Sequence, residues 1–346
     1  MDDQTISSRK QQIIRAIILE YIEGAEPISS DLIANKYDLG VRSATIRNEM
    51  AEITDLGFLD QPHTSAGRIP SDQGYRYFVD HLLLLGKPNQ EEKRTLKTAT
   101  RDEETLRDLV QETTKALSRM TKLMTAAVTV RDAKVRIRNA IVTALGPDRA
   151  LFILVLENGH TENRIIDCPS GLTLDQIGLV NETLQNSLAG HPLGDVPKIK
   201  PASLGHPTAQ QLLNNSLNAL RTTAKDLTRG HLIVEGEEYV LSQPEFQRET
   251  TTLNQIIDSL ADEDAVREEI SSFKAENQIT IGRENSVEPH YPLTFIRRTF
   301  KVANQDAGVI AIIGPTRMNY SRNLGLLDYT AESITDVLTK LFHPNL

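Results

Sequence analysis

Cysteine and aromatic residues are scarce in this chain, and tryptophan is absent. The 346 residues include one cysteine, Cys168, with 8 tyrosines and 8 phenylalanines. A single cysteine excludes an internal disulfide framework. Its place before Pro169, after a strand-like run, favours a buried small residue over a reactive thiol. The shortage of aromatic side chains argues against a carbohydrate site or an aromatic cage.

Long apolar runs are also missing. No stretch of about 18 apolar residues occurs, and the N-terminus carries no apolar segment of the kind that directs secretion. We therefore expect a cytoplasmic protein without a membrane span. The length is sufficient for two or three domains, each able to bury a core.

The motifs of common catalytic and metal sites are absent as well. There is no glycine-rich loop followed by Lys-Ser/Thr, no His-Glu-x-x-His and no cysteine cluster. His191 and His206 each precede a proline, a setting typical of surface loops. We expect no enzyme activity, no metal and no cofactor.

An excess of basic residues, the usual footprint of a nucleic-acid-binding domain, is lacking. The chain has 38 Lys+Arg and 47 Asp+Glu, a net charge of −9. Residues 1–85 alone hold 8 Lys+Arg and 13 Asp+Glu, a net charge of −5. If this part binds DNA, its few cations must be gathered on one surface. Non-specific binding is then weak and depends strongly on dimerisation.

A short amphipathic helix is nevertheless indicated after residue 42. Ile46, Met50 and Ile53 recur at i, i+4 and i+7, which places them on one helical face. Ser43 is expected to be the N-cap, and Gly57 is placed to end the helix in a left-handed conformation.

The opposite face of this helix has the chemistry of a DNA reader. Ala44 and Asn48 point away from the apolar side and are flanked by Thr45 and Arg47. Arginine and asparagine carry the donors that recognise guanine and adenine edges in the major groove. The alternative is an ordinary amphipathic surface helix.

The surrounding segments predict a winged helix-turn-helix. An apolar stripe over 13–22 indicates a first helix, Ser29 or Ser30 can cap a second, and the turn 38–40 leads into the third. Residues 58–61 and 68–69 read as two strands around a turn at 62–67. Arg68, at the base of this wing, is placed for a phosphate or the minor groove; the alternative is an ion pair with Asp60.

The same segment carries long motifs of a known family. LGVRSATIRNEMAEITDLGFLDQPHTSAGRIPSDQGYRYFVD (39–80) resembles the N-terminal domain of the heat-inducible transcription repressor family, HrcA. GPTRMNY (314–320) and ITIGREN (279–285) resemble two further signatures of that family. The resemblance spans nearly the whole chain, with a loosely patterned middle.

The resemblance implies a repressor of chaperone genes in the bacterial cytoplasm, associated with the nucleoid. It further implies a homodimer on double-stranded DNA, bound to an inverted-repeat operator called CIRCE and modulated by the chaperonin. Arg47 and Asn48 are expected to specify sequence, and the remaining candidates to fix register. The candidate DNA-binding residues are Arg42, Ser43, Ala44, Thr45, Arg47, Asn48, His63, Thr64 and Arg68. Arg42 departs from the small residue of many relatives and can add a phosphate contact or alter operator preference.

The rest of the chain is expected to be α+β. Helical patterns occupy 71–85, 90–125, 174–188 and 320–341, and strand patterns occupy 137–145, 150–156, 162–167, 279–282, 294–302 and 308–313. We expect these strands to form one antiparallel sheet of the GAF/PAS type, and the resemblance favours GAF-like. Since such domains often bind small ligands, a small-molecule-sensing transcription factor is the alternative function.

The expected domains are a winged helix at 1–86, a linker helix region at 87–128, a GAF-like domain at 129–190 and 276–346, and an insertion at 191–275. The resemblance implies that such an insertion carries dimer contacts. Its candidate interface residues share a helical spacing; they are Leu212, Leu213, Leu217 and Leu220. The alternative is that these leucines form a private core of the inserted subdomain.

Overall fold

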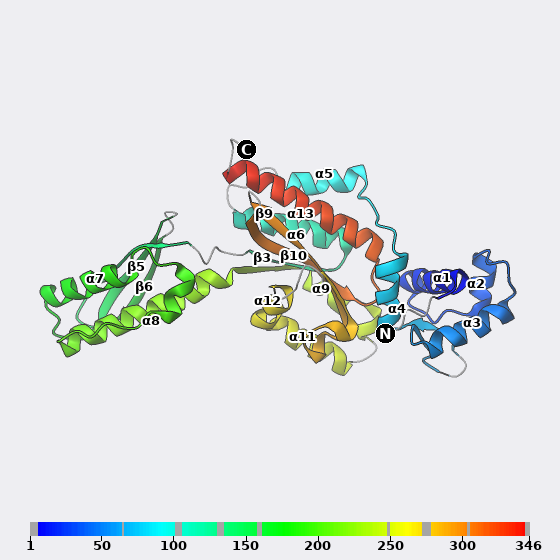
Figure 1. Cartoon of the computed structure of the whole chain (residues 1–346), viewed down its shortest axis with the longest axis horizontal. Helices are drawn as coiled ribbons and strands as arrows, with labels where there is room; N and C mark the ends of the chain where they lie inside the picture. The colour runs from blue at the N-terminus through cyan, green and yellow to red at the C-terminus, as the bar shows by residue number, and fades with distance from the viewer. Residues whose placement is uncertain are drawn as a thin grey trace. The chain divides into compact units, whose positions relative to one another are not determined.

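The computed structural model describes residues 6–63, 66–100, 106–129, 135–157, 161–247, 250–271, 278–302 and 305–342. It is α+β, with antiparallel sheets and many helices (Figure 1). Contacts within the chain separate it into two compact units, 1–129 with 232–346, and 130–231. We call the first the main unit and the second, which interrupts it in sequence, the inserted unit.

The main unit begins with three helices and a hairpin. The elements are α1 (Ser8–Gly24), α2 (Ser30–Lys36), α3 (Ser43–Asp55), β1 (Leu59–Asp60) and β2 (Ile69–Pro70). The predicted isoleucine stripe of α1 is buried, including Ile13, Ile14 and Ile17. Ser29 caps α2, because its hydroxyl accepts the backbone N–H of Leu32 at 3.2 Å.

The C-terminal end of α3 agrees with the expectation from sequence, and the N-terminal end does not. Gly57 has φ +84°, with N–H bonds from Gly57 to Thr54 O and from Phe58 to Ile53 O. These two bonds are a Schellman motif, as the glycine predicted. The prediction that Ser43 is the N-cap is wrong: Arg42 occupies that position without a side-chain cap, and Ser43 is the first helical residue.

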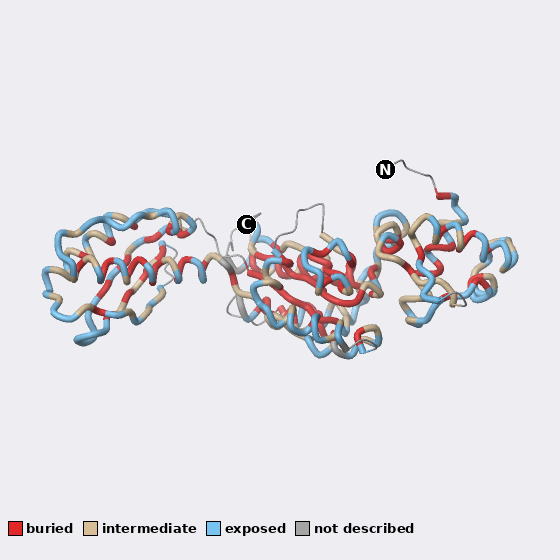
Figure 2. Tube along the Cα trace, turned by 90° about the horizontal axis from the view of Figure 1, so that it is seen from below, coloured by how far each residue is buried: buried red, intermediate tan, exposed pale blue. Residues whose placement is uncertain are grey.

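A five-stranded sheet forms the centre of the main unit, in the order β7-β3-β10-β9-β8. The strands are β3 (Met124–Thr129), β7 (His231–Glu235), β8 (Ile279–Ile281), β9 (Leu293–Val302) and β10 (Gln305–Pro315). Both faces are covered, and every residue of β3 is buried. Figure 2 shows buried residues concentrated along this sheet.

Different helices cover the two faces of this sheet. α5 (Gln90–Ala99), α6 (Leu106–Thr121) and α13 (Tyr320–Phe342) lie on one side, and α9 (Glu237–Leu241), α10 (Pro244–Gln247), α11 (Thr250–Ala261) and α12 (Glu263–Ser271) lie on the other (Figure 1). Along β10, Ile310 and Ile312 join the first layer, whereas Val309, Ala311 and Ile313 join the second. This alternation is the period of two of a pleated strand.

The helical stretch 90–125 is therefore not one connecting helix. It contains α5 and α6, and its residues 124–125 already belong to β3. Leu109 and Leu117, part of the heptad-like stripe, are fully buried within the chain. Intramolecular packing accounts for the apolar spacing.

The inserted unit has a three-stranded antiparallel sheet and two long helices. Its strands β4 (Ile137–Ala144), β5 (Arg149–Leu156) and β6 (Thr161–Asp167) pair in sequence order. α7 (Leu174–Leu188) and α8 (Pro207–Arg229) share one core with a single face of this sheet. Cys168 is buried there, and burial raises the pKa of its thiol.

The inserted unit, residues 130–231, differs from the insertion expected from the sequence, residues 191–275. β4–β6 were expected to share a sheet with β9 and β10, and instead they form a separate sheet. α8 packs on α7 and β6, whereas residues 232–271 pack on the five-stranded sheet. Alternation along a strand identifies its buried face but not its partner strand, which is set by contacts distant in sequence.

The four candidate interface leucines lie inside the inserted unit. Leu212, Leu213, Leu217 and Leu220 are between 0% and 5% exposed and contribute to the core shared with α7 and the sheet. Their side chains are unavailable to a second copy, so the expectation that they form a dimer surface is wrong. The alternative, a private core of the 191–275 insertion, does not describe them either, because their core includes residues of β4, β5 and α7.

No helix in the described ranges is long and apolar enough to span a membrane.

Candidate nucleic-acid interface

The outward face of α3 is formed by the residues predicted from helical spacing. Ile46, Met50 and Ile53 are buried, whereas the candidates on the other side are exposed; these are Arg42, Ala44, Thr45, Arg47 and Asn48. Among the described residues, neither Arg42 nor Arg47 has an ion-pair partner within 4.0 Å. Their guanidinium groups are therefore available to an external anion.

Two of the three acidic residues of α3, Glu49 and Glu52, point back toward α1, where they are neutralised. Arg9 Nε donates to Glu49 Oε1 at 2.8 Å, and Lys10 Nζ lies 2.7 Å from Glu52 Oε2. The Glu49 carboxylate raises the pKa of Arg9. This arrangement explains how a domain of net negative charge can present a positive helix face.

Ser43 does not belong to that exposed face. Its hydroxyl donates to Asp31 Oδ1 and lies 3.0 Å from Ser30 Oγ. The side chain thus ties the start of α3 to α2.

The hairpin is joined to the segment before α2. The backbones of Ile28 and Arg68 exchange two hydrogen bonds of 2.8 and 2.9 Å. A Cβ on Gly67 would lie 2.4 Å from Ile28 O, so only glycine allows this approach. His63 is exposed before the tip of the hairpin. Thr64 lies outside the described residues.

Arg68 is directed toward α3 and not toward Asp60. Its Nε donates to Thr54 Oγ1 at 2.9 Å. Thr54 was not among the predicted residues, since an ordinary threonine near a helix end carries no signal of a partner 14 positions away. The ion pair with Asp60, the alternative from sequence, is not the contact observed.

Arg68 and Arg47 line the same groove. It has a volume of about 470 Å³ and runs between α3, the start of α2 and the hairpin. Its lining residues are Ile28, Ser29, Ser30, Arg47, Met50, Gln61, Ala66, Gly67 and Arg68. Both charged groups in this lining are positive, which suits a phosphate.

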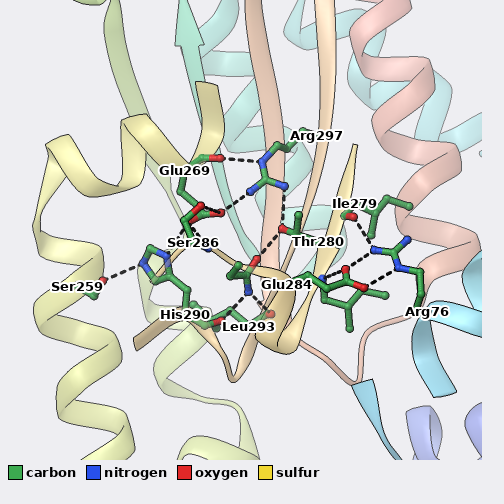
Figure 3. A network of polar contacts seen from close by, with 12 residues as sticks. Arg76, Ser259, Glu269, Ile279, Thr280, Glu284, Ser286, His290, Leu293 and Arg297 are labelled. Carbon is green, nitrogen blue, oxygen red and sulfur yellow. Dashed lines mark hydrogen bonds and ion pairs between the residues drawn. The ribbon is translucent and has the colours of Figure 1, made fainter. Parts of the chain in front are cut away.

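The two C-terminal signature motifs hold this N-terminal segment against the sheet. Arg76, on α4 (Asp72–Tyr77), donates from Nε to Glu284 Oε1 at 2.8 Å and from Nη2 to Ile279 O at 2.7 Å (Figure 3). Arg317 donates to Ile22 O at 2.7 Å and forms an ion pair with Glu245. Arg317 thus ties the end of α1 to the segment that follows β10.

A buried polar network lies beside the Arg76 contact (Figure 3). Arg297 and Glu269, 1% and 4% exposed, are joined by an Nη2–Oε1 bond of 3.0 Å. Arg297 also donates to Thr280 Oγ1 at 2.9 Å, and His290 lies between Ser259 and Glu269. Burial lowers the pKa of Arg297 to about 10, so its guanidinium stays charged at neutral pH.

Comparison with known proteins gives the family. A model described as the HrcA protein C-terminal domain matches residues 107–324, more than half of the chain. A protein of Desulforudis audaxviator, named heat-inducible transcription repressor HrcA, is 32% identical over 97% of this chain and 99% of its own length. This chain belongs to the HrcA family. A Symbiobacterium thermophilum protein of the same name is 33% identical over 97% of this chain and 100% of its own.

The fold also has a counterpart among solved structures. A crystal structure described only as a hypothetical protein matches with a TM-score of 0.56 and 20% identity. The match covers 98% of this chain and 100% of the other. At this identity the likeness supports the α+β fold of the HrcA family member and carries no information on its ligands.

Proposed function

We propose that this chain is a heat-inducible transcription repressor that binds double-stranded DNA in the bacterial cytoplasm. Its HrcA relatives carry that name. The observation that supports it most is the exposed face of α3, where Arg47 and Asn48 stand free of the acids that turn back to α1. In this proposal α2 and α3 are a helix-turn-helix and the β1–β2 hairpin is its wing.

The proposed contacts divide into two groups. Arg47 and Asn48 read base edges in the major groove, because their paired donors match guanine and adenine. The others fix the position of the protein on the phosphate backbone; they are Arg42, Thr45, His63, Thr64 and Arg68. Ala44 allows close approach, and Ser43 orients the helix.

An inverted-repeat operator of the CIRCE type requires two copies of the recognition helix. We propose that a second copy docks on the open face of the inserted sheet, opposite α7 and α8. Three cross-strand rows form the uncharged part of this face: Thr143–Leu151–Ile165, Ile141–Ile153–Asn163 and Asn139–Val155–Thr161. At one end of the face, Arg149 pairs with Asp167, so the two charges there are opposite.

The chemistry of the open face favours a second copy over a charged partner. All nine residues are uncharged in a chain of net charge −9, and Ile165 is 60% exposed. Two copies of these uncharged rows can meet without repulsion between like charges. In a dimer with a two-fold axis, each copy contributes the same surface to the interface. The uncovered aliphatic side chains would then leave water.

The five-stranded sheet with its helices is, in this proposal, GAF-like, and the chaperonin is a co-regulator that acts on the repressor. A metabolite sensor is the less favoured function. The apolar pocket between α9 and α11 has a volume of about 170 Å³, below the roughly 300–1,000 Å³ of most small-molecule sites.

Fluorescence anisotropy tests the proposal directly. The purified full chain is titrated onto a CIRCE inverted-repeat duplex and onto a scrambled duplex at near-physiological salt, with and without chaperonin. We expect tighter binding to the inverted repeat and a further gain with chaperonin. Equal affinity for both duplexes would overturn sequence-specific repression, whereas selective binding indifferent to chaperonin would overturn the co-regulator alone.

A further inference from the structure

The groove between α3 and the hairpin has the charge of an anion site. Its lining contains no carboxylate, and its two charged residues are Arg47 from α3 and Arg68 from the hairpin. One arginine is exposed, and the other is half-buried at the base of the hairpin. A DNA backbone that passes between a recognition helix and its wing would place a phosphate at this groove.

Arg68 is fixed at both its backbone and its side chain. Its main chain pairs with Ile28 through hydrogen bonds of 2.8 and 2.9 Å, and its Nε donates to Thr54 Oγ1 at 2.9 Å. Within the described ranges, the two terminal nitrogens have no protein acceptor. The planar guanidinium is thus held by one edge while its other donors remain for a ligand.

The direction of the Thr54 hydrogen bonds is determined by its chemistry. A hydroxyl has one proton to donate, and Thr54 Oγ1 gives that proton to Met50 O at 2.8 Å. It can therefore only accept from Arg68. The hydroxyl links a carbonyl of α3 to the guanidinium, so the position of Arg68 follows the position of the helix.

We infer that Thr54 is a positioning residue that holds Arg68 ready for a DNA phosphate in this groove. The inference rests on the proposed DNA-binding function and adds to it how the wing arginine is aligned with the recognition helix. Holding the side chain before DNA arrives removes the cost of immobilising a flexible arginine upon binding. Because phosphates are the same at every base pair, the gain in affinity is independent of sequence.

A double-mutant cycle tests this inference in the full chain. T54V removes the hydroxyl at nearly constant volume, T54S retains it, and R68A removes the guanidinium. Affinity is measured on the inverted-repeat and scrambled duplexes at several salt concentrations. T98V is the matched control, since Thr98 Oγ1 makes the same bond to a carbonyl four residues back, Arg94 O at 3.0 Å, on the distant helix α5.

We expect T54V to weaken binding by about 3- to 10-fold on both duplexes alike. T54S and T98V should stay within about 2-fold of the wild type. R68A should reduce the slope of log affinity against log salt by about 1 for each phosphate lost. T54V should have no further effect in the R68A background.

Two results would overturn the inference. The first is that T54V binds DNA as tightly as the wild type. The second is that T54V lowers DNA affinity as much in the R68A background as in the wild-type background. The second would indicate damage to α3 itself, which would also lower the preference for the inverted repeat. Thermal melting of each variant checks that it is folded. If T54V melts at a lower temperature than the wild type, R68K is measured in its place. Lysine keeps the positive charge but lacks the Nε–H that bonds to Thr54, so R68K should weaken DNA binding similarly.

Failure of the proposed function gives a different pattern. A wild type that binds both duplexes equally overturns sequence-specific repression, yet the Thr54–Arg68 cycle still decides the inference on either duplex. A wild type that binds neither duplex overturns both.

Discussion

At the scale of single residues, Arg47 has the clearest assignment. It is exposed, free of ion pairs among the described residues and beside Asn48 on the outward face of α3. R47A should weaken binding to the inverted repeat by about 1–3 kcal/mol and relax specificity, because a bidentate base contact is lost. Anisotropy titrations on both duplexes measure this.

R138A provides the control for R47A. Arg138 is exposed on β4 of the inserted unit, so its loss changes the net charge equally without touching α3. The same loss of affinity in both variants would contradict a base contact by Arg47 and indicate a general charge effect.

The lowered pKa of Glu269 predicts that the free energy of unfolding depends on pH. Burial would raise the pKa of this carboxyl, but its bonds to His290 and Arg297 outweigh burial, so the pKa lies below the ordinary 4.5. The folded state thus binds fewer protons than the unfolded state in acid. This contribution is complete above pH 4.5 and is lost as the pH falls through the folded-state pKa.

The variant E269Q tests this at neutral pH. It leaves Arg297 as a buried charge without a counter-ion, which should lower the free energy of unfolding by about 3–5 kcal/mol. It should also flatten the acid limb of a plot of unfolding free energy against pH. Urea denaturation between pH 3 and 7 measures both, and an acid limb as steep as that of the wild type would contradict the assignment.

Residue-scale prediction from sequence succeeded where the cause was local. The spacing of Ile46, Met50 and Ile53 fixed which side of α3 faces out, and Gly57 ended the helix because it tolerates positive φ. It failed for Ser43, which bonds to Asp31 on another helix, and for Thr54, which bonds to Arg68. Such partners are set by tertiary packing.

At the scale of elements, most helices and strands follow their sequence patterns, and their grouping does not. α7 begins and ends at the predicted residues, Leu174 and Leu188. β4–β6, however, have their own sheet. A strand with one apolar face can pack on any layer of matching shape, so alternation alone left the choice of sheet undetermined.

The open face of the inserted sheet gives the prediction at this scale. I165E places a charge on the proposed dimer surface and should convert the dimer to a monomer in analytical ultracentrifugation, weakening self-association by more than about 10-fold. L174E is the matched control, because Leu174 is 86% exposed at the start of α7, away from the open face. Dimers that persist in I165E, or are lost equally in L174E, would exclude this face.

At the scale of the whole molecule, the Arg76 contact connects the N-terminal helices to the five-stranded sheet. Arg76 joins α4, next to the hairpin, to Glu284 and Ile279 at the edge of the five-stranded sheet. The pair is partly exposed, at 29% and 37%, so its contribution is small, on the order of 1 kcal/mol. Even so, together with the bond of 3.0 Å from Arg283 N–H to Asp72 Oδ2, it joins α4 to the edge of the sheet.

R76A should lower the melting temperature of the chain by about 2–4 °C. The temperature at which the protein releases its operator should fall in parallel, because the helices that hold α3 lose a support. Calorimetry and anisotropy during heating measure the two. K198A, which removes the exposed Lys198–Asp195 pair of the inserted unit, should change neither; equal shifts in both variants would remove any special role of Arg76.

The pairing of strands distant in sequence in the central sheet affects how the chain folds while it is being synthesised. Val128 of β3 pairs with Val309 of β10, a residue that leaves the ribosome about 180 residues later. The N-terminal helices and the inserted unit can each assemble from nearby sequence, but the five-stranded sheet waits for almost the entire polypeptide. Until then β3, which is buried on both sides in the folded chain, has no neighbour from β10, and a nascent chain in this condition is a natural client for the chaperones of the cell.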